Sequence, residues 1–240
     1  MRAQPDIKQP NFREIATLLR GEVDTVYTWN QSLDARRLLL QLIVIIVGAG
    51  CYGAAMGWWR DPQQAFYTAV KFPLIILLTT AGNALINGML APLLGLNIPF
   101  RQSLSAIVMS FAITSAIFGA FSPLIAFMVW NAPPMSAGRS GALVYNCILL
   151  AQVLVIALAG TTGNLRLFQL LRRAGGSRAV AWRVTFAWLA ANFFLGSQLS
   201  WMLRPFIGSP GLPVEFLRGN ALEGNFYECV LRSLRYLFAD

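Results

Sequence analysis

The amino-acid sequence predicts an all-α integral membrane protein with five transmembrane helices and amphipathic helices before the first and after the last. Three observations lead to this prediction. Hydrophobic residues make up 56% of the 240 positions and charged residues only 12%, about half the charged fraction of a soluble domain. Five stretches reach the roughly 20 apolar residues that a membrane-spanning helix needs. Between Asp61 and Glu215 the chain contains no acidic residue, so this apolar region lacks carboxylates.

The five predicted spans are continuous apolar segments without the period-two alternation of a transmembrane β-strand. They cover residues 38–59, 68–94, 104–130, 141–165 and 184–203. Small residues recur in the first span and favour close packing of its backbone. These residues are Gly48, Gly50, Gly53, Ala54 and Gly57. Proline interrupts the hydrogen bonds of a helix, so Pro73 and Pro123 are expected to shorten or kink the second and third spans.

The charged residues predict the division of the chain and its orientation. The predicted parts are a cytoplasmic N-terminal segment (1–37), a five-helix transmembrane domain (38–206) and an extracytoplasmic C-terminal tail (207–240). Arginines gather in the predicted loop around residues 166–183, beside the first span at Arg36 and Arg37, and at Arg101. With five spans these regions share one side, which the positive-inside rule makes cytoplasmic. We therefore expect the N-terminus inside and the C-terminus outside.

Two segments outside the spans have the apolar stripe of an amphipathic helix. Before the first span, apolar residues recur at three- and four-residue steps from Phe12 to Tyr27, and Asn11 with Glu14 has the pattern of a capping box. In the tail, Asn225 and Glu228 repeat that pattern ahead of a second stripe. This stripe contains Phe226, Val230, Leu234 and Leu237. Each helix is expected to lie either on the membrane surface or against protein.

The apolar region lacks the side chains that most often perform acid–base catalysis, proton transfer and metal binding. The chain has no histidine, and Cys51, Cys147 and Cys229 form no close pair. We therefore predict a protein that is not an enzyme, with no catalytic residues, no metal and no cofactor. The net charge of +9 belongs to the loops, which favours contact with membrane lipids over nucleic acid.

The polar side chains within the spans are amides and hydroxyls. Thr80, Asn83 and Asn87 lie three and four residues apart, so they share one face of the second span. Either this candidate polar face lines a hydrated path or a pocket for a neutral or lipid-like ligand, or its amides form interhelical hydrogen bonds. We favour the hydrogen-bond interpretation, because such bonds are common between membrane helices.

A second candidate site lies at the outer end of the fifth span. Gln198, Trp201 and Arg204 are spaced by three residues and share a helix face. Arg204 is expected to reach a phosphate at the membrane surface or to pair with Glu215. The set is therefore a candidate contact for a lipid headgroup or an anion, although a structural role at the end of the last helix is favoured. Lys71, at the outer end of the second span, is expected to extend toward the membrane surface.

The layout resembles the Yip-type family of membrane proteins, which have a cytosolic N-terminal segment followed by five clustered spans. The resemblance covers residues 36–206 and depends on the five spans, the N-inside orientation and two short segments. These segments are Lys71-Phe72-Pro73-Leu74 and Leu93-Leu94-Gly95. In style the chain is similar to bacterial five-span proteins, which implies a bacterial cytoplasmic (inner) membrane. The resemblance implies a scaffold or trafficking-type role through binding of membrane and partners, without catalysis.

The predicted function is a non-enzymatic membrane scaffold or an accessory subunit of a membrane complex, with a protein partner or a second copy of the chain. The main alternative is an oligomeric channel or facilitator for an anion, neutral solute or lipid, built on the polar face of the second span. A membrane enzyme acting on lipid near Arg204 is a third alternative. It requires a nucleophile, which the sequence does not indicate.

Overall fold

The computed structural model confirms the all-α membrane fold. It describes residues 13–20, 23–31, 34–135, 138–175, 177–208 and 212–228, and the regular elements in these ranges are helices. The principal helices are α1 (Arg13–Arg20), α2 (Val23–Gln31), α3 (Ala35–Gly57), α4 (Pro62–Leu93), α5 (Phe100–Trp130), α6 (Gly138–Gly175) and α7 (Arg178–Met202). Within the described ranges, the five helices from α3 to α7 are long and apolar enough to cross a membrane.

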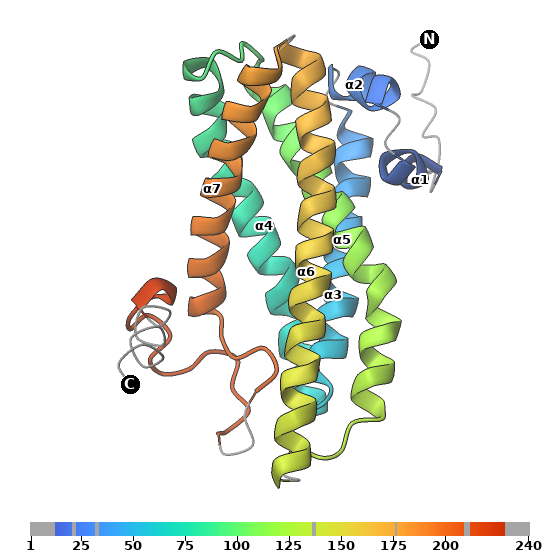
Figure 1. Ribbon diagram of the computed structural model, residues 1–240, viewed down its shortest axis with the longest axis vertical. Coiled ribbons are helices and arrows are strands. Elements are labelled where there is room, and N and C mark those ends of the chain that lie inside the picture. The colour runs from blue at the N-terminus through green and yellow to red at the C-terminus, as the bar shows by residue number, and fades with distance from the viewer. Residues whose placement is uncertain are drawn as a thin grey trace, which may run out of the picture.

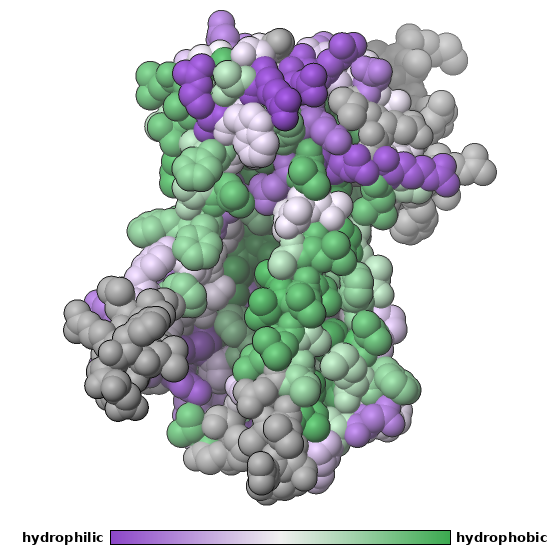
Figure 2. Space-filling view, in the orientation of Figure 1, coloured by the Kyte–Doolittle hydropathy of each residue, from purple (hydrophilic) through white to green (hydrophobic). Residues whose placement is uncertain are grey.

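The five long helices run up and down through one bundle (Figure 1). α3 packs against α4 and α5, α5 also packs against α6, and α7 packs against α4 and α6 at the edge of the bundle. The helices α1 and α2 lie at one end, called here the amino end, and the chain that follows α7 lies at the other, the tail end. Figure 2 shows hydrophilic residues gathered at the amino end and hydrophobic residues covering the side of the bundle below it.

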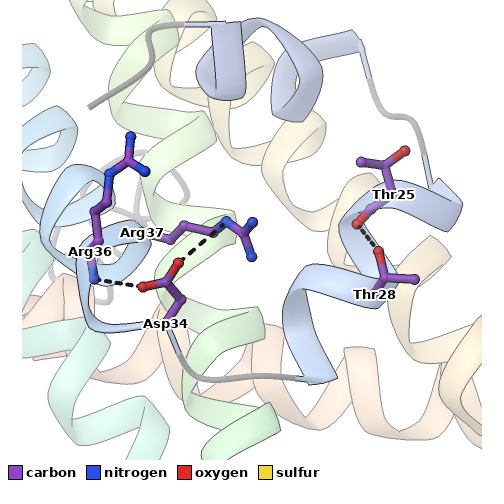
Figure 3. Close-up of polar contacts among 5 residues, drawn as sticks. All are labelled: Thr25, Thr28, Asp34, Arg36 and Arg37. Atoms are coloured by element: carbon purple, nitrogen blue, oxygen red, sulfur yellow. Dashed lines mark hydrogen bonds and ion pairs between the residues drawn. The ribbon is translucent and has the colours of Figure 1, made fainter. Parts of the chain in front are cut away.

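An aspartate starts the first long helix at the amino end. Asp34 Oδ1 accepts a hydrogen bond from the backbone N–H of Arg36 at 3.0 Å, and its Oδ2 lies 3.9 Å from Arg37 Nε (Figure 3). A carboxylate at this position satisfies a free backbone donor and interacts favourably with the helix dipole. In the preceding helix α2, the Thr28 hydroxyl donates to the carbonyl of Thr25 at 2.7 Å.

Asp61 starts α4 at the tail end in the same way, accepting from the backbone N–H of Gln63 at 2.7 Å. Pro62 takes the first helical position, where its missing N–H leaves no hydrogen bond unmade. These caps explain why α3 and α4 begin before the predicted starts at residues 38 and 68. Apolar residues alone mark the part of a helix that lies in lipid, whereas caps mark where the helix begins.

The structure divides the predicted N-terminal amphipathic helix into two helices, α1 and α2, which contact α5 and α6. Asn11 and the side chain of Glu14 lie outside the described residues. At the other terminus the predicted capping pattern is confirmed. The Glu228 backbone N–H donates to Asn225 Oδ1 at 2.9 Å, and Asn225 Nδ2 donates to Glu228 Oε1 at 2.7 Å. The stripe beyond this point, from Val230 onward, also lies outside the described residues.

The close packing predicted for the small residues of the first span is confirmed. A Cβ atom built on Gly48 would lie 2.1 Å from the carbonyl oxygen of Ser115 in α5, and one on Gly53 would lie 2.4 Å from that of Thr68 in α4. Only hydrogen atoms fit at these two positions, so the backbones of three helices are in direct contact. Gly50 also faces α4, but its nearest neighbouring atom, the carbonyl oxygen of Ala69, is 3.4 Å away.

One expectation about the spans is wrong, and half of another. The predicted basic loop at residues 166–183 is mostly helical, because α6 continues to Gly175 and α7 begins at Arg178. The apolar residues Leu167, Leu170 and Leu171 are at most 2% exposed, and burying them keeps this part of α6 helical and packed. Pro73 and Pro123 were expected to shorten or kink their spans. They do not shorten them, because α4 and α5 continue through both prolines and neighbouring helices compensate for a lost hydrogen bond.

Candidate functional site

One face of α4 near the tail end carries three buried polar side chains. Gln64, Thr68 and Lys71 are four and three residues apart, so they lie above one another on the helix. Each is 0% exposed. A buried amide, hydroxyl or ammonium needs a hydrogen-bond partner, because an unpaired polar group costs about 1–3 kcal/mol, and a charged one more.

The chain after α7 supplies these partners, because it turns back into the bundle and presents two successive carbonyls to α4. The Pro205 carbonyl accepts from Gln64 Nε2 and from Lys71 Nζ, both at 3.0 Å. The Phe206 carbonyl accepts from Gln64 Nε2 and from Thr68 Oγ1, both at 2.8 Å. These three side chains and two carbonyls are called here the tail latch. The latch holds the start of the tail inside the bundle.

Lys71 does not extend toward the surface as expected. Its ammonium is buried, donates to the Pro205 carbonyl, and lies 5.0 Å from the centre of the Phe216 ring. Among the described residues both salt bridges lie at the amino end, so the carboxylate of Glu215 pairs neither with Lys71 nor with Arg204. The positive charge of Lys71 is thus held by a carbonyl and an aromatic ring.

The structure brings two of the three predicted headgroup residues together. The Arg204 guanidinium lies 3.7 Å from the centre of the Trp201 ring, and it donates to the carbonyls of Trp201 at 2.7 Å and Asn220 at 3.2 Å. Trp201 Nε1 donates to the Glu223 carbonyl at 3.2 Å. Gln198 lies partly buried one turn earlier on α7. The pair of Arg204 and Trp201 therefore fixes the tail against the end of α7.

A cleft of about 540 Å³ opens beside the tail latch, between the tail, α3 and α6. Its polar side chains are Arg204, Arg218 and Gln152. The apolar part of its wall contains Met56, Tyr145, Leu149, Phe206, Ile207 and Leu212. A neighbouring cavity of about 390 Å³ shares both arginines and adds Glu223 and Glu228. Figure 2 shows the surface hollowed between α6 and α7.

The predicted polar face of the second span is buried in α4, where Thr80, Asn83 and Asn87 are at most 4% exposed. Asn87 Nδ2 donates to Asn83 Oδ1, and Asn83 Nδ2 donates to Asn192 Oδ1 on α7. The Thr80 hydroxyl donates to the Ile76 carbonyl of its own helix at 2.6 Å. The asparagines thus form a chain of amides that joins α4 to α7.

Replacing Asn83 by leucine should weaken the attachment of α7. The substitution leaves Asn87 Nδ2 and Asn192 Oδ1 without partners in an apolar environment, so we expect a loss of about 1–3 kcal/mol of unfolding free energy. Unfolding of the purified protein in mixed micelles measures this loss. The control is Thr162→Val, which removes an exposed hydroxyl bonded within its own helix. Equal stability of the two variants would contradict a structural role for the amide chain.

The sequence contains a signal for the tail latch that counting apolar residues does not detect. Gln64, Thr68 and Lys71 have the spacing of one helix face, but the second span was predicted to begin at residue 68, which leaves Gln64 outside it. The capping pair Asp61-Pro62 places all three on one helix. No comparable pattern in the sequence indicates that Arg218 or Gln152 belongs to the same site.

Comparison with known proteins gives no match: none with a protein-family model, none with a curated protein and none with a solved structure. Within the described part of the chain, no group of three or more His, Cys, Asp or Glu side chains lies close enough together to hold a metal ion. The functional proposal therefore rests on the geometry of this structure and on the sequence.

Proposed function

We propose that this protein is a non-enzymatic membrane scaffold or accessory subunit, and that its N-terminal helix pair, α1 and α2, is the platform for a protein partner. The observation behind the proposal is the set of polar contacts that hold this pair against α6. Arg166 of α6 donates to the carbonyls of Leu19 and Arg20 at 3.2 and 3.3 Å, and Arg173 lies 3.2 Å from Asp24. Two short helices fixed in this way present a defined surface.

Most of the exposed side chains described on the pair are polar, with Leu19 as an exposed apolar one, and this suits binding outside the lipid. Val26 is buried against the bundle at 8% exposed, while Arg20, Asp24 and Thr28 are exposed. The surrounding amino end is rich in arginine. Its arginines are Arg36, Arg37, Arg101, Arg166, Arg172, Arg173, Arg178 and Arg183. Under the positive-inside rule this end faces the cytoplasm, so we propose a bacterial cytoplasmic membrane with the platform inside.

The polar groups within the spans support a scaffold more than a channel. The amides of Asn83, Asn87 and Asn192 bond to one another, and the hydroxyl of Thr114 donates to carbonyls of Ser110 and Ala159. A conducting path needs polar groups that face water, whereas these groups join helices. The Yip-type layout of the chain also favours a role in binding partners.

The proposal is tested by isolating the protein from its own membranes under mild conditions and measuring the mass of its complex. We expect a stoichiometric protein partner that is lost when residues 1–30 are deleted and weakened when residues 224–240 are deleted. Arg166→Gln should also reduce partner recovery, because it removes the donor that holds α1 and costs about 1 kcal/mol at an exposed site.

The matched control is Arg183→Gln, which removes an exposed arginine from the same end but only a hydrogen bond within α7. It should retain the partner. If the variant lacking residues 1–30 inserts normally and yields a complex of the same composition as the full chain, the platform proposal is wrong.

A further inference from the structure

The cleft beside the tail latch combines a cationic edge with an apolar wall. Arg204 and Arg218 both line it, and no acidic residue is among the described residues that line it. The apolar wall includes Met56, Leu149 and Phe206, from α3, α6 and the tail. We propose that this cleft binds an anionic phospholipid, with the phosphate between the arginines and the glycerol and acyl part against the wall.

The two arginines suit a phosphate group. A guanidinium presents paired N–H donors that match two phosphate oxygens, and it is more weakly hydrated than an ammonium. The Trp201 ring and the carbonyls of Trp201 and Asn220 hold Arg204 in place. The Arg204 side chain therefore loses little conformational entropy when a ligand binds. Lys71 donates to the carbonyl of Pro205, a lining residue of the cleft, and adds a third positive charge nearby.

Gln152 provides an independent indication of a ligand. This α6 side chain lines the cleft, is 3% exposed, and its Nε2 has no hydrogen-bond partner within the described part of the chain. A buried donor without an acceptor is unfavourable. An oxygen atom of a phosphate or glycerol group in the cleft supplies the missing acceptor.

The depth of the cleft favours a lipid over a soluble anion. Gln152 lies eleven residues inside the apolar span 141–165, which belongs to α6, about 16 Å along the helix at 1.5 Å per residue. A free phosphate at this depth would leave the apolar wall in contact with water, whereas a phospholipid covers it. The volume of about 540 Å³ lies within the range of small-molecule sites, about 300–1,000 Å³.

The test is native mass spectrometry of the full chain in mild detergent, titrated with dioleoylphosphatidylglycerol, dioleoylphosphatidylcholine or inorganic phosphate. We expect one phosphatidylglycerol to bind preferentially. Arg218→Gln and Gln152→Leu should each weaken this binding about tenfold. The control Arg183→Gln removes an equal charge from the amino end and should bind as the unchanged protein does. Unfolding temperatures of all variants check that each remains folded.

Three results would overturn the proposal. The first is equal binding of the two lipids, which would show that the cleft does not select negative charge. The second is unchanged phosphatidylglycerol binding in folded Arg218→Gln and Gln152→Leu, which would place the lipid elsewhere. The third is displacement of the lipid by inorganic phosphate at equal concentration, which would assign the cleft to a soluble anion. None of these results depends on whether the N-terminal helix pair binds a partner.

Discussion

Replacing Gly48 by alanine is expected to lower the stability of the bundle by about 3 kcal/mol or more, at the upper end of the range for overpacked sites. The added Cβ would lie 2.1 Å from the carbonyl oxygen of Ser115. That oxygen belongs to the backbone of α5 and cannot rotate away, so α3 and α5 must separate. Gly119, across the same contact, also approaches the Gly48 backbone. Thermal unfolding in detergent micelles, followed by tryptophan fluorescence, measures the loss.

The same helix provides the matched control. Gly50→Ala adds the same methyl group where the nearest atom is 3.4 Å away, and Gly160→Ala in α6 adds it where no atom lies within 4 Å. Both variants should unfold close to the temperature of the unchanged protein. If Gly48→Ala and Gly50→Ala unfold at the same temperature, α3 and α5 are not in the direct backbone contact described above.

Removing hydrogen bonds from the tail latch is expected to weaken the attachment of the tail to the bundle by a similar free energy. The double variant Gln64→Leu/Thr68→Val keeps the volume of both side chains but removes the donors to the Phe206 carbonyl and one donor to the Pro205 carbonyl. Losing three hydrogen bonds is expected to lower the free energy needed to open this part of the tail by about 3 kcal/mol. Backbone amides at residues 206–208 should therefore exchange hydrogen about 100-fold faster, which hydrogen–deuterium exchange mass spectrometry measures.

Gln63→Leu is the control for the latch, because the exposed Gln63 side chain donates to the Tyr67 hydroxyl at 2.7 Å and not to the tail. Its exchange at residues 206–208 should match that of the unchanged protein. Identical exchange in the double variant and the control would contradict the tail latch, and would mean that apolar contacts of the tail alone keep it in the bundle.

The sequence predicts the fold well because lipid imposes a simple rule on a helix: a long apolar segment spans the membrane. Capping residues are local signals too, and the Asn225–Glu228 pair was recognised from its spacing alone. The predicted loop around Arg172 and Arg173 was wrong because charge suggests a loop, although a helix can project arginines from one side while burying leucines on the other. Composition therefore predicts which segments lie in lipid better than where each helix ends.

The site was harder to predict because its parts are brought together by tertiary structure. Arg204 follows Trp201 by three residues at the end of α7, so their association could be predicted from spacing. Gln152 and Arg218 come from α6 and the tail, and nothing in their local sequence relates them to Arg204. Lys71 was expected to reach the surface because a lone lysine has that tendency, and only the return of the tail provides its acceptor.

The tail latch has a consequence for how the protein is made. The hydrogen bond from Gln64 to the Phe206 carbonyl joins positions 142 residues apart, so α4 leaves the ribosome long before its partner. Until translation passes Phe206, the amide, hydroxyl and ammonium of α4 have no tail carbonyls to bond. A chain that ends before Arg204 would retain every span yet lack the carbonyls that bond this polar face.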